Sequence, residues 1–279
     1  MGDLRSAIQG QVQALFGNTE GNRIDLTRPA GDPGLFGPDS VAWRVHGDFT
    51  SMMIGGVASL LLQMLHPAAL AGVWDHSGFR GDMQGRLRRT AQFISGTTFG
   101  STATAEALIA RVRSIHDRVA GTLADGTPYS ANDPALLTWV HVAEIYAFLT
   151  AYRRHVDPAL PDTQADRYVA ETAVVAQRLG AGDVPTTWAA VEAYLQAMRP
   201  ALRFDHRTRE VARALLGQRA PTLALAPFRT LTLTAAADLL PEWAARMHGL
   251  PQPLAQRAGV RAGVAGVGTV MRWALRPAR

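Results

Sequence analysis

The chain has 279 residues and no cysteine, which excludes disulfides, cysteine-ligated metals, thiol nucleophiles, haem–thiolate ligation and covalently attached haem. Apolar residues make up 47% of the sequence and charged residues 18%, which excludes a disordered protein and allows a large buried core. The 28 basic residues are all arginine and are mostly dispersed, so the net charge of +5 does not indicate a nucleic-acid-binding stripe.

The first half of the chain reads as helices joined by Gly/Pro-rich loops. We expect a short helix over 4–16, a loop, and then an apolar helix over 50–65 that Pro67 ends. Gly55 and Gly56 in that helix indicate close helix packing. Its length of roughly 24 Å is short of the ~30 Å hydrocarbon core, so we interpret it as a buried central helix rather than a membrane span.

Helical patterns continue to the C-terminus. Residues 75–85 are expected to form a loop, and the segment ADGTPYSAND a turn-rich connection before a helix that Asp133 caps and Pro134 opens. The alternation in RTLTLTAAA is a brief strand signal. The helices expected after residue 80 cover 83–94, 102–121, 134–154, 164–179, 186–199, 208–216 and 228–240.

These patterns predict an all-α fold without an evident linker or repeat. We expect one helical domain over 1–279, with a partly extended segment over 1–35 and a peripheral helix over 255–279. The first residues lack the apolar run of a signal sequence, so we expect a cytoplasmic location, with peripheral membrane contact as an additional prediction.

Several catalytic motifs are absent from the sequence. It contains no Gly-rich phosphate loop, HExxH, GxSxG, Asp-rich calcium loop or Glu-x-x-His di-iron pair. Metal or cofactor chemistry therefore falls to the eight histidines.

His116 lies on the face of a regular helix that also carries Leu108, Val112 and Val119, so its ring is expected to point toward the core. A buried histidine must be satisfied. The pattern alone favours an ordinary hydrogen bond over a metal ligand.

His141 and His66 are the other two histidines of interest. Glu144, three residues after His141, is placed to orient the His141 ring, although a structural role for this histidine is again favoured. His66 precedes Pro67 at a helix end, which also favours a structural role.

The segment GRLRRTAQFI places Arg86, Arg89, Thr90 and Phe93 on one helical face, beside an apolar stripe. Two guanidinium groups and a hydroxyl can bind an anion or a polarised oxygen. The plainer interpretation is a solvated face.

Five segments in order resemble a known family: DPGLFGPDSVAWRVHGD, LLLQMLHPAALAGVWDHSGFRGD, GRLRRTAQFI, VRSIHDRV and DPALLTWVHVAEIYAFLTAYRRH. The chain is similar to the family of bacterial rubber oxygenase (latex-clearing protein) and the fungal mycophenolic-acid pathway oxygenase, and more so to its actinobacterial relatives. The similarity covers nearly the whole chain. It implies a globin-like helical core, a b-type haem whose iron a histidine ligates, and oxygen-dependent chemistry.

The resemblance also implies roles for individual residues. In rubber oxygenase an Arg-x-x-Lys-Thr segment lies on the distal side of the haem, and Arg86, Arg89 and Thr90 match it here as catalytic residues. A histidine on the next helix ligates the iron, and His116 matches it best. His141 is then a pocket residue or a second ligand.

Two departures separate this chain from rubber oxygenase. The family lysine that can cap the iron is Arg89 here, and a guanidinium stays protonated, so we expect no such cap. The stretch PAALAGVWDHSG holds no glutamate where rubber oxygenase has its base, and Asp75 or His76 is the substitute that the sequence offers. Cleavage of polyisoprene is therefore not inferred.

The leading hypothesis is a haem b-dependent oxygenase or peroxidase-like oxidoreductase that uses O2 or peroxide on an apolar small molecule. One alternative is a non-catalytic haem- or lipid-binding protein. A second alternative is a non-haem iron enzyme that uses His116, His141 and Glu144 as two histidines and one carboxylate.

Overall fold

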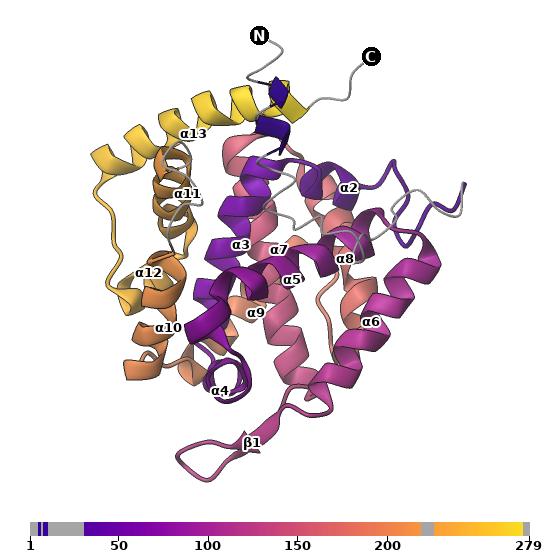
Figure 1. Cartoon of the computed structure of the whole chain (residues 1–279), viewed down its shortest axis with the longest axis vertical. Coiled ribbons are helices and arrows are strands. Elements are labelled where there is room, and N and C mark those ends of the chain that lie inside the picture. The colour runs from indigo at the N-terminus through magenta and orange to yellow at the C-terminus, as the bar shows by residue number, and fades with distance from the viewer. Residues whose placement is uncertain (1–4, 7, 11–30, 219–225, 276–279) are drawn as a thin grey trace.

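The computed structural model describes residues 5, 6, 8–10, 31–218 and 226–275. Within them the chain is helical apart from one small hairpin (Figure 1), which confirms the all-α prediction. The elements, in chain order, are α2 (Val41–His46), α3 (Phe49–Gln63), α4 (Pro67–His76), α5 (Phe79–Phe99), α6 (Thr102–His116), β1 (Ala120–Thr122), β2 (Pro128–Ser130), α7 (Pro134–His155), α8 (Asp162–Leu179), α9 (Trp188–Met198), the 3-10 turn η1 (Arg199–Ala201), α10 (His206–Leu216), α11 (Ala226–Leu239), α12 (Glu242–His248) and α13 (Leu254–Leu275).

The centre of the molecule is the crossing of α3 and α7, the most extensively packed pair of described helices. Gly55 permits this close approach, because a Cβ there would lie 2.8 Å from the Phe148 ring and 3.0 Å from the Ala147 carbonyl oxygen. The indole of the fully buried Trp139 donates a hydrogen bond to the Gln63 carbonyl oxygen at 3.2 Å. The prediction of a buried central helix is confirmed, and the close packing predicted at two glycines is confirmed at Gly55, whereas a Cβ at Gly56 would make only an ordinary contact of 3.9 Å with the Phe148 ring.

A sharp bend of 103° joins α3 to α4. Pro67 opens α4, and His66 caps it, because His66 Nδ1 accepts a hydrogen bond from the Ala68 N–H at 3.2 Å. The structural role predicted for His66 is confirmed, but at the start of α4 rather than at the end of α3.

Among the described helices, α7 is long and apolar enough to cross a membrane, as are α3 and α4 if the bent pair is taken as one span. However, 67% of the apolar window of α7 is buried inside the protein. That degree of burial is typical of the core helix of a globular protein.

The predicted loop over 75–85 is wrong, because α5 begins at Phe79. A kink at Asp82 (φ −141°, ψ 55°) separates its first turn from the rest. The Asp82 carboxylate accepts a hydrogen bond from the Gly85 N–H at 2.8 Å and so starts the helix again after the kink.

The predicted helix over 102–121 is too long. Helix α6 ends at His116, and the chain then forms the antiparallel hairpin of β1 and β2, in which Gly121 pairs with Tyr129. The turn between them contains Gly126 at φ +88°, a left-handed conformation that glycine adopts without strain. The alternating stretch RTLTLTAAA is not a strand but part of α11.

The peripheral helix predicted over 255–279 corresponds to α13, which lies along one edge of the molecule beside α11 (Figure 1). Most of the expected segment 1–35, including much of the helix expected over 4–16, lies outside the described residues. One cluster of buried apolar side chains extends from Val41 in α2 to Val264 in α13. A globin-like arrangement of this core stays a prediction.

Candidate functional site

The three residues of α5 that were predicted as catalytic have different environments. The Arg86 side chain lies deep in the protein and makes no hydrogen bond or ion pair within the described residues, and burial lowers its pKa, with a smaller contribution from Arg89. Arg89 is exposed and pairs with Asp82 at 3.2 Å. Thr90 is also exposed, and its hydroxyl donates to the Arg86 carbonyl oxygen at 3.2 Å. Only Arg86 therefore points its charge inward.

His116 is the last residue of α6, a helix that packs mainly on α5 and α8. Its ring is half-buried, and Nδ1 is enclosed without a partner in the described part of the chain. Burial lowers the pKa of His116, and the neighbouring Asp117 opposes this in part. The ring is therefore neutral at pH 7, which is the form that ligates a metal.

His141 and Glu144 lie one turn apart on α7. Burial lowers the pKa of His141 to about 4, and its Nε2 is enclosed without a partner among the described residues. Burial raises the pKa of Glu144 to about 7, and the described residues give its carboxyl no hydrogen bond. A buried polar group without a partner is costly, so these two side chains point to a function or a ligand.

Four titratable side chains from three helices lie deep in the protein. Arg86, His141 and Glu144, and also His46 of α2, are surrounded by protein, yet each keeps part of its surface accessible. Figure 1 shows the helices concerned, with α5 crossing in front of α7 and α6 at its side.

His46 belongs to a hydrogen-bonded chain that the sequence did not predict. Its Nδ1 lies 2.8 Å from the Thr98 hydroxyl of α5, and its Nε2 lies 2.9 Å from the Tyr168 hydroxyl of α8. Burial lowers the pKa of His46 to about 3, so the ring is neutral. Burial raises the pKa of Tyr168 well above its ordinary value, and the nearby Glu144 carboxylate adds to this. Without knowledge that α2, α5 and α8 meet here, nothing in the sequence distinguished His46.

The candidates for the missing glutamate, Asp75 and His76, hold the hairpin instead. The Tyr129 hydroxyl donates to Asp75 at 2.7 Å, and His76 Nε2 lies 3.1 Å from the Ala120 carbonyl oxygen. Both side chains are exposed. The structure therefore gives them a role in fastening β1 and β2 to α4.

The non-haem iron alternative is wrong for the described residues. Within them no three histidine, aspartate or glutamate side chains come close enough together to hold a metal ion. The set of His116, His141 and Glu144 is thus not assembled.

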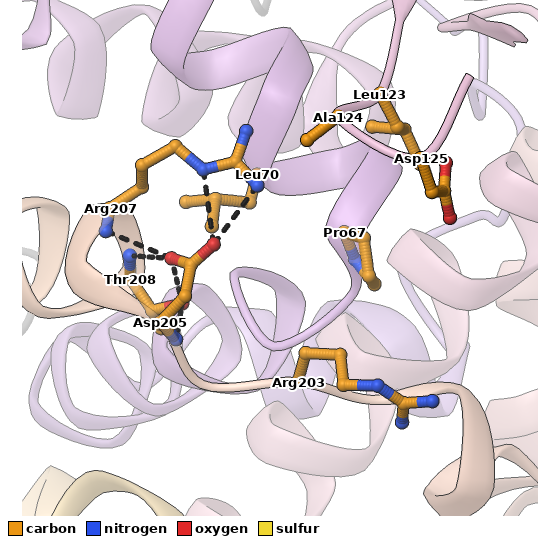
Figure 2. A pocket seen from close by; sticks show the side chains of 9 residues that line it. All are labelled: Pro67, Leu70, Leu123, Ala124, Asp125, Arg203, Asp205, Arg207 and Thr208. Atoms are coloured by element: carbon orange, nitrogen blue, oxygen red, sulfur yellow. Dashed lines mark hydrogen bonds and ion pairs between the residues drawn. The ribbon is translucent and has the colours of Figure 1, made fainter. Parts of the chain in front are cut away.

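Two hollows can be described, and neither is lined by histidine. The first, shown in Figure 2, has a volume of about 170 Å³ between α4, the hairpin turn and the start of α10. Asp205 in its wall is already bound, since it pairs with Arg207 at 2.9 Å and accepts from the Thr208 N–H at 3.0 Å. Ligand pockets are usually about 300–1,000 Å³, so this hollow is too small for a large cofactor.

The second hollow, of about 570 Å³, lies at the surface between α9 and α12. Trp243 forms one wall, and the Arg199 guanidinium lies 5.8 Å from the centre of its ring. It holds no histidine.

The histidines present nevertheless fit a b-type haem. Such a haem needs one neutral imidazole to ligate its iron and no cluster of ligands. His116 and His141 both carry enclosed ring nitrogens that have no partner in the part of the chain that the structure describes, and both rings are neutral. The donors therefore suit a haem better than a metal ion held by the protein alone.

The chain matches a known protein family over most of its length. The model of the family described as ER-bound oxygenase mpaB/B'/rubber oxygenase, catalytic domain, matches residues 43–273. No curated protein and no solved structure matches the chain. Because the family match spans most of the sequence, the chain belongs to the catalytic-domain family of mpaB and rubber oxygenase.

Proposed function

We propose that this member of an oxygenase family is a haem b-dependent oxidoreductase that uses O2 or peroxide on an apolar small molecule. The observation that carries the proposal is His116, a neutral histidine at the end of α6, a helix that packs against α5; its enclosed ring nitrogen has no partner among the described residues. His116 would ligate the iron, and His141 would line the pocket or serve as a second ligand. A bound haem would supply the activation of oxygen.

Arg86 is the distal residue that the geometry supports best. Its guanidinium stays protonated and lacks a carboxylate partner in the described residues, so it can donate hydrogen bonds to a polarised oxygen. Arg89 and Thr90 would act through Arg86. Arg89 holds Asp82 at the kink of α5, and Thr90 bonds to the Arg86 carbonyl oxygen.

Glu144 would serve as the group of the site that holds and releases a proton. A carboxyl with a pKa of about 7 can hold or release a proton at its oxygens near neutral pH. It would thus do the work for which the sequence offered Asp75 or His76.

An apolar substrate is expected from the residues that remain partly accessible around the core. Ala69 and Val73 of α4, Leu87 and Ile94 of α5, and Val140 of α7 are partly buried and pack against the core. Such surfaces favour apolar ligands. A cytoplasmic location with peripheral membrane contact belongs to the same proposal, because apolar substrates partition into membranes.

The proposal is tested with haem-loaded protein, hydrogen peroxide and guaiacol, a general electron donor. We expect steady oxidation of guaiacol, and a rate about 100-fold or more lower in Arg86→Leu, because one aligned donor typically contributes that much. Arg88→Leu, an exposed arginine on the same helix, is the control and should leave the rate unchanged. Haem binding without any turnover would instead support the non-catalytic alternative.

A further inference from the structure

Helix α13 presents a mostly apolar face without acidic residues to the solvent. Its 22 residues include no aspartate or glutamate. Residues on its exposed side are small or apolar apart from one glutamine, one arginine and one threonine; these residues are Leu254, Ala255, Gln256, Ala258, Gly259, Arg261, Ala262, Ala265, Gly266, Thr269, Val270 and Trp273. The outer face of a surface helix is normally polar, so this face is unusual.

The large exposed apolar side chains of the protein also gather on this helix. Of the four in the described residues, Leu254 is 83% exposed, Val270 46% and Trp273 37%, and only Ile115 lies elsewhere. A contiguous exposed apolar surface marks an interaction site, whereas isolated exposed residues do not.

The opposite side of α13 is fixed to the protein. Val260 and Val264 are buried, and Gly263 lies so close to α11 that a Cβ there would come within 3.0 Å of Leu231. Arg272 of α13 pairs with the buried Asp48 at 3.2 Å. The helix is therefore held with its apolar face turned outward, along the edge of the molecule seen in Figure 1.

Positive charge borders this face. Arg257 and Arg261 of α13 and Arg154 of α7 all pair with the single buried carboxylate of Asp238, at 3.2 to 3.3 Å. Three positive charges and one negative charge leave a net charge of +2, and the adjacent His155 is neutral because burial and Arg154 lower its pKa to about 4. On the helical wheel, the arginines of α13 fall along one border of the exposed face.

We propose that α13 lies on an anionic membrane surface, with its apolar face in the headgroup region and its arginine border toward the lipid phosphates. An amphipathic helix with arginine at the border and tryptophan and leucine on the apolar face has this chemistry. Trp273 suits the interface in particular, because its ring is apolar and its indole N–H is polar.

A second copy of the chain suits this face less well. A helix of this length covers a strip of about 33 Å by 10 Å, or roughly 330 Å². A stable dimer needs about 800 Å² per partner. Facing copies would also bring together two arginine borders of the same sign.

The test is sedimentation of the full chain with two kinds of vesicle, phosphatidylcholine alone and phosphatidylcholine mixed with phosphatidylglycerol. We expect binding to the anionic vesicles only. Trp273→Glu and Val270→Glu should each weaken the affinity for these vesicles by about tenfold or more, because each inserts a charge into the apolar face. Ile115→Glu is the control, since it changes an exposed apolar residue of α6 outside this face.

Absence of binding to either vesicle, or equal loss of binding in Ile115→Glu, would overturn the proposal. A dimer in light scattering that Trp273→Glu dissociates, without vesicle binding, would assign the face to a second copy. Thermal unfolding of each variant distinguishes loss of binding from loss of fold. None of these outcomes depends on haem.

Discussion

Glu144 is a carboxyl group placed where a charge is costly. Burial raises its pKa from 4.5 to about 7, and the described residues give it no hydrogen bond. Between these two pH values the folded protein keeps a proton that the unfolded chain has released. The contribution of Glu144 to stability is therefore highest below pH 4.5 and falls as the pH rises to about 7.

This argument predicts a difference between wild type and Glu144→Gln. Urea unfolding at a series of pH values measures the free energy of unfolding of both proteins. From pH 4.5 to above 7, that of the wild type should fall by about 3 kcal/mol relative to that of the variant, since each pKa unit is worth about 1.4 kcal/mol. Glu192→Gln, at an exposed glutamate, should show the same change in the free energy of unfolding with pH as the wild type. If Glu144→Gln also shows the pH dependence of the wild type, Glu144 is not a buried titrating group.

A site residue could be predicted where its own helix determines the orientation of its side chain. The inward orientation of His116 follows from helical period, and the half-burial of Leu108 and Val112 agrees with it. The same period grouped Arg86 with Arg89, but the pairing of Arg89 with Asp82 draws that guanidinium to the surface. His46 depends on Tyr168 of another helix, and a sequence pattern cannot show such a contact.

At the scale of elements, the crossing of α3 and α7 depends on one of two adjacent glycines. A Cβ at Gly55 would lie within 3.0 Å of backbone atoms of α7 at Ala147 and Phe148, which cannot move aside cheaply. At Gly56 the nearest atom, in the Phe148 ring, would be 3.9 Å away, an ordinary contact.

Gly55→Ala should therefore destabilise the protein by about 1–3 kcal/mol, as overpacking in cores does. Gly56→Ala is the matched control and should leave stability unchanged or raise it by up to about 1 kcal/mol, because alanine favours a helix over glycine. Midpoints of urea unfolding measure both changes. Equal effects of the two substitutions would show that the close crossing does not decide stability.

Helix boundaries were predicted correctly where a residue caps the helix that it starts. Asp133 and Pro134 start α7 as expected, because the cap is local: the Asp133 carboxylate accepts from the Ala135 and Leu136 N–H groups at 2.9 Å. The end of α6 was missed, since the hairpin that follows it is fastened by Asp75 of α4, a partner distant in sequence.

At the scale of the whole molecule, the all-α class followed from composition and helical period, because these reflect burial along each helix. The relative placement of helices did not follow from them. Asp238 of α11 binds Arg154 of α7 and both Arg257 and Arg261 of α13, so one buried carboxylate joins three helices. Such convergence of residues far apart in the sequence appears only in the fold.

The central claim is that His116 ligates a haem iron. The absorption spectrum of the full chain, purified from cells supplied with a haem precursor, tests it most directly. We predict a Soret band in the wild type, in His141→Ala and in the exposed control His76→Gln, and its loss in His116→Ala with folding retained. A wild-type protein that binds no added hemin, or a Soret band that survives in His116→Ala and disappears in His141→Ala, would contradict the account.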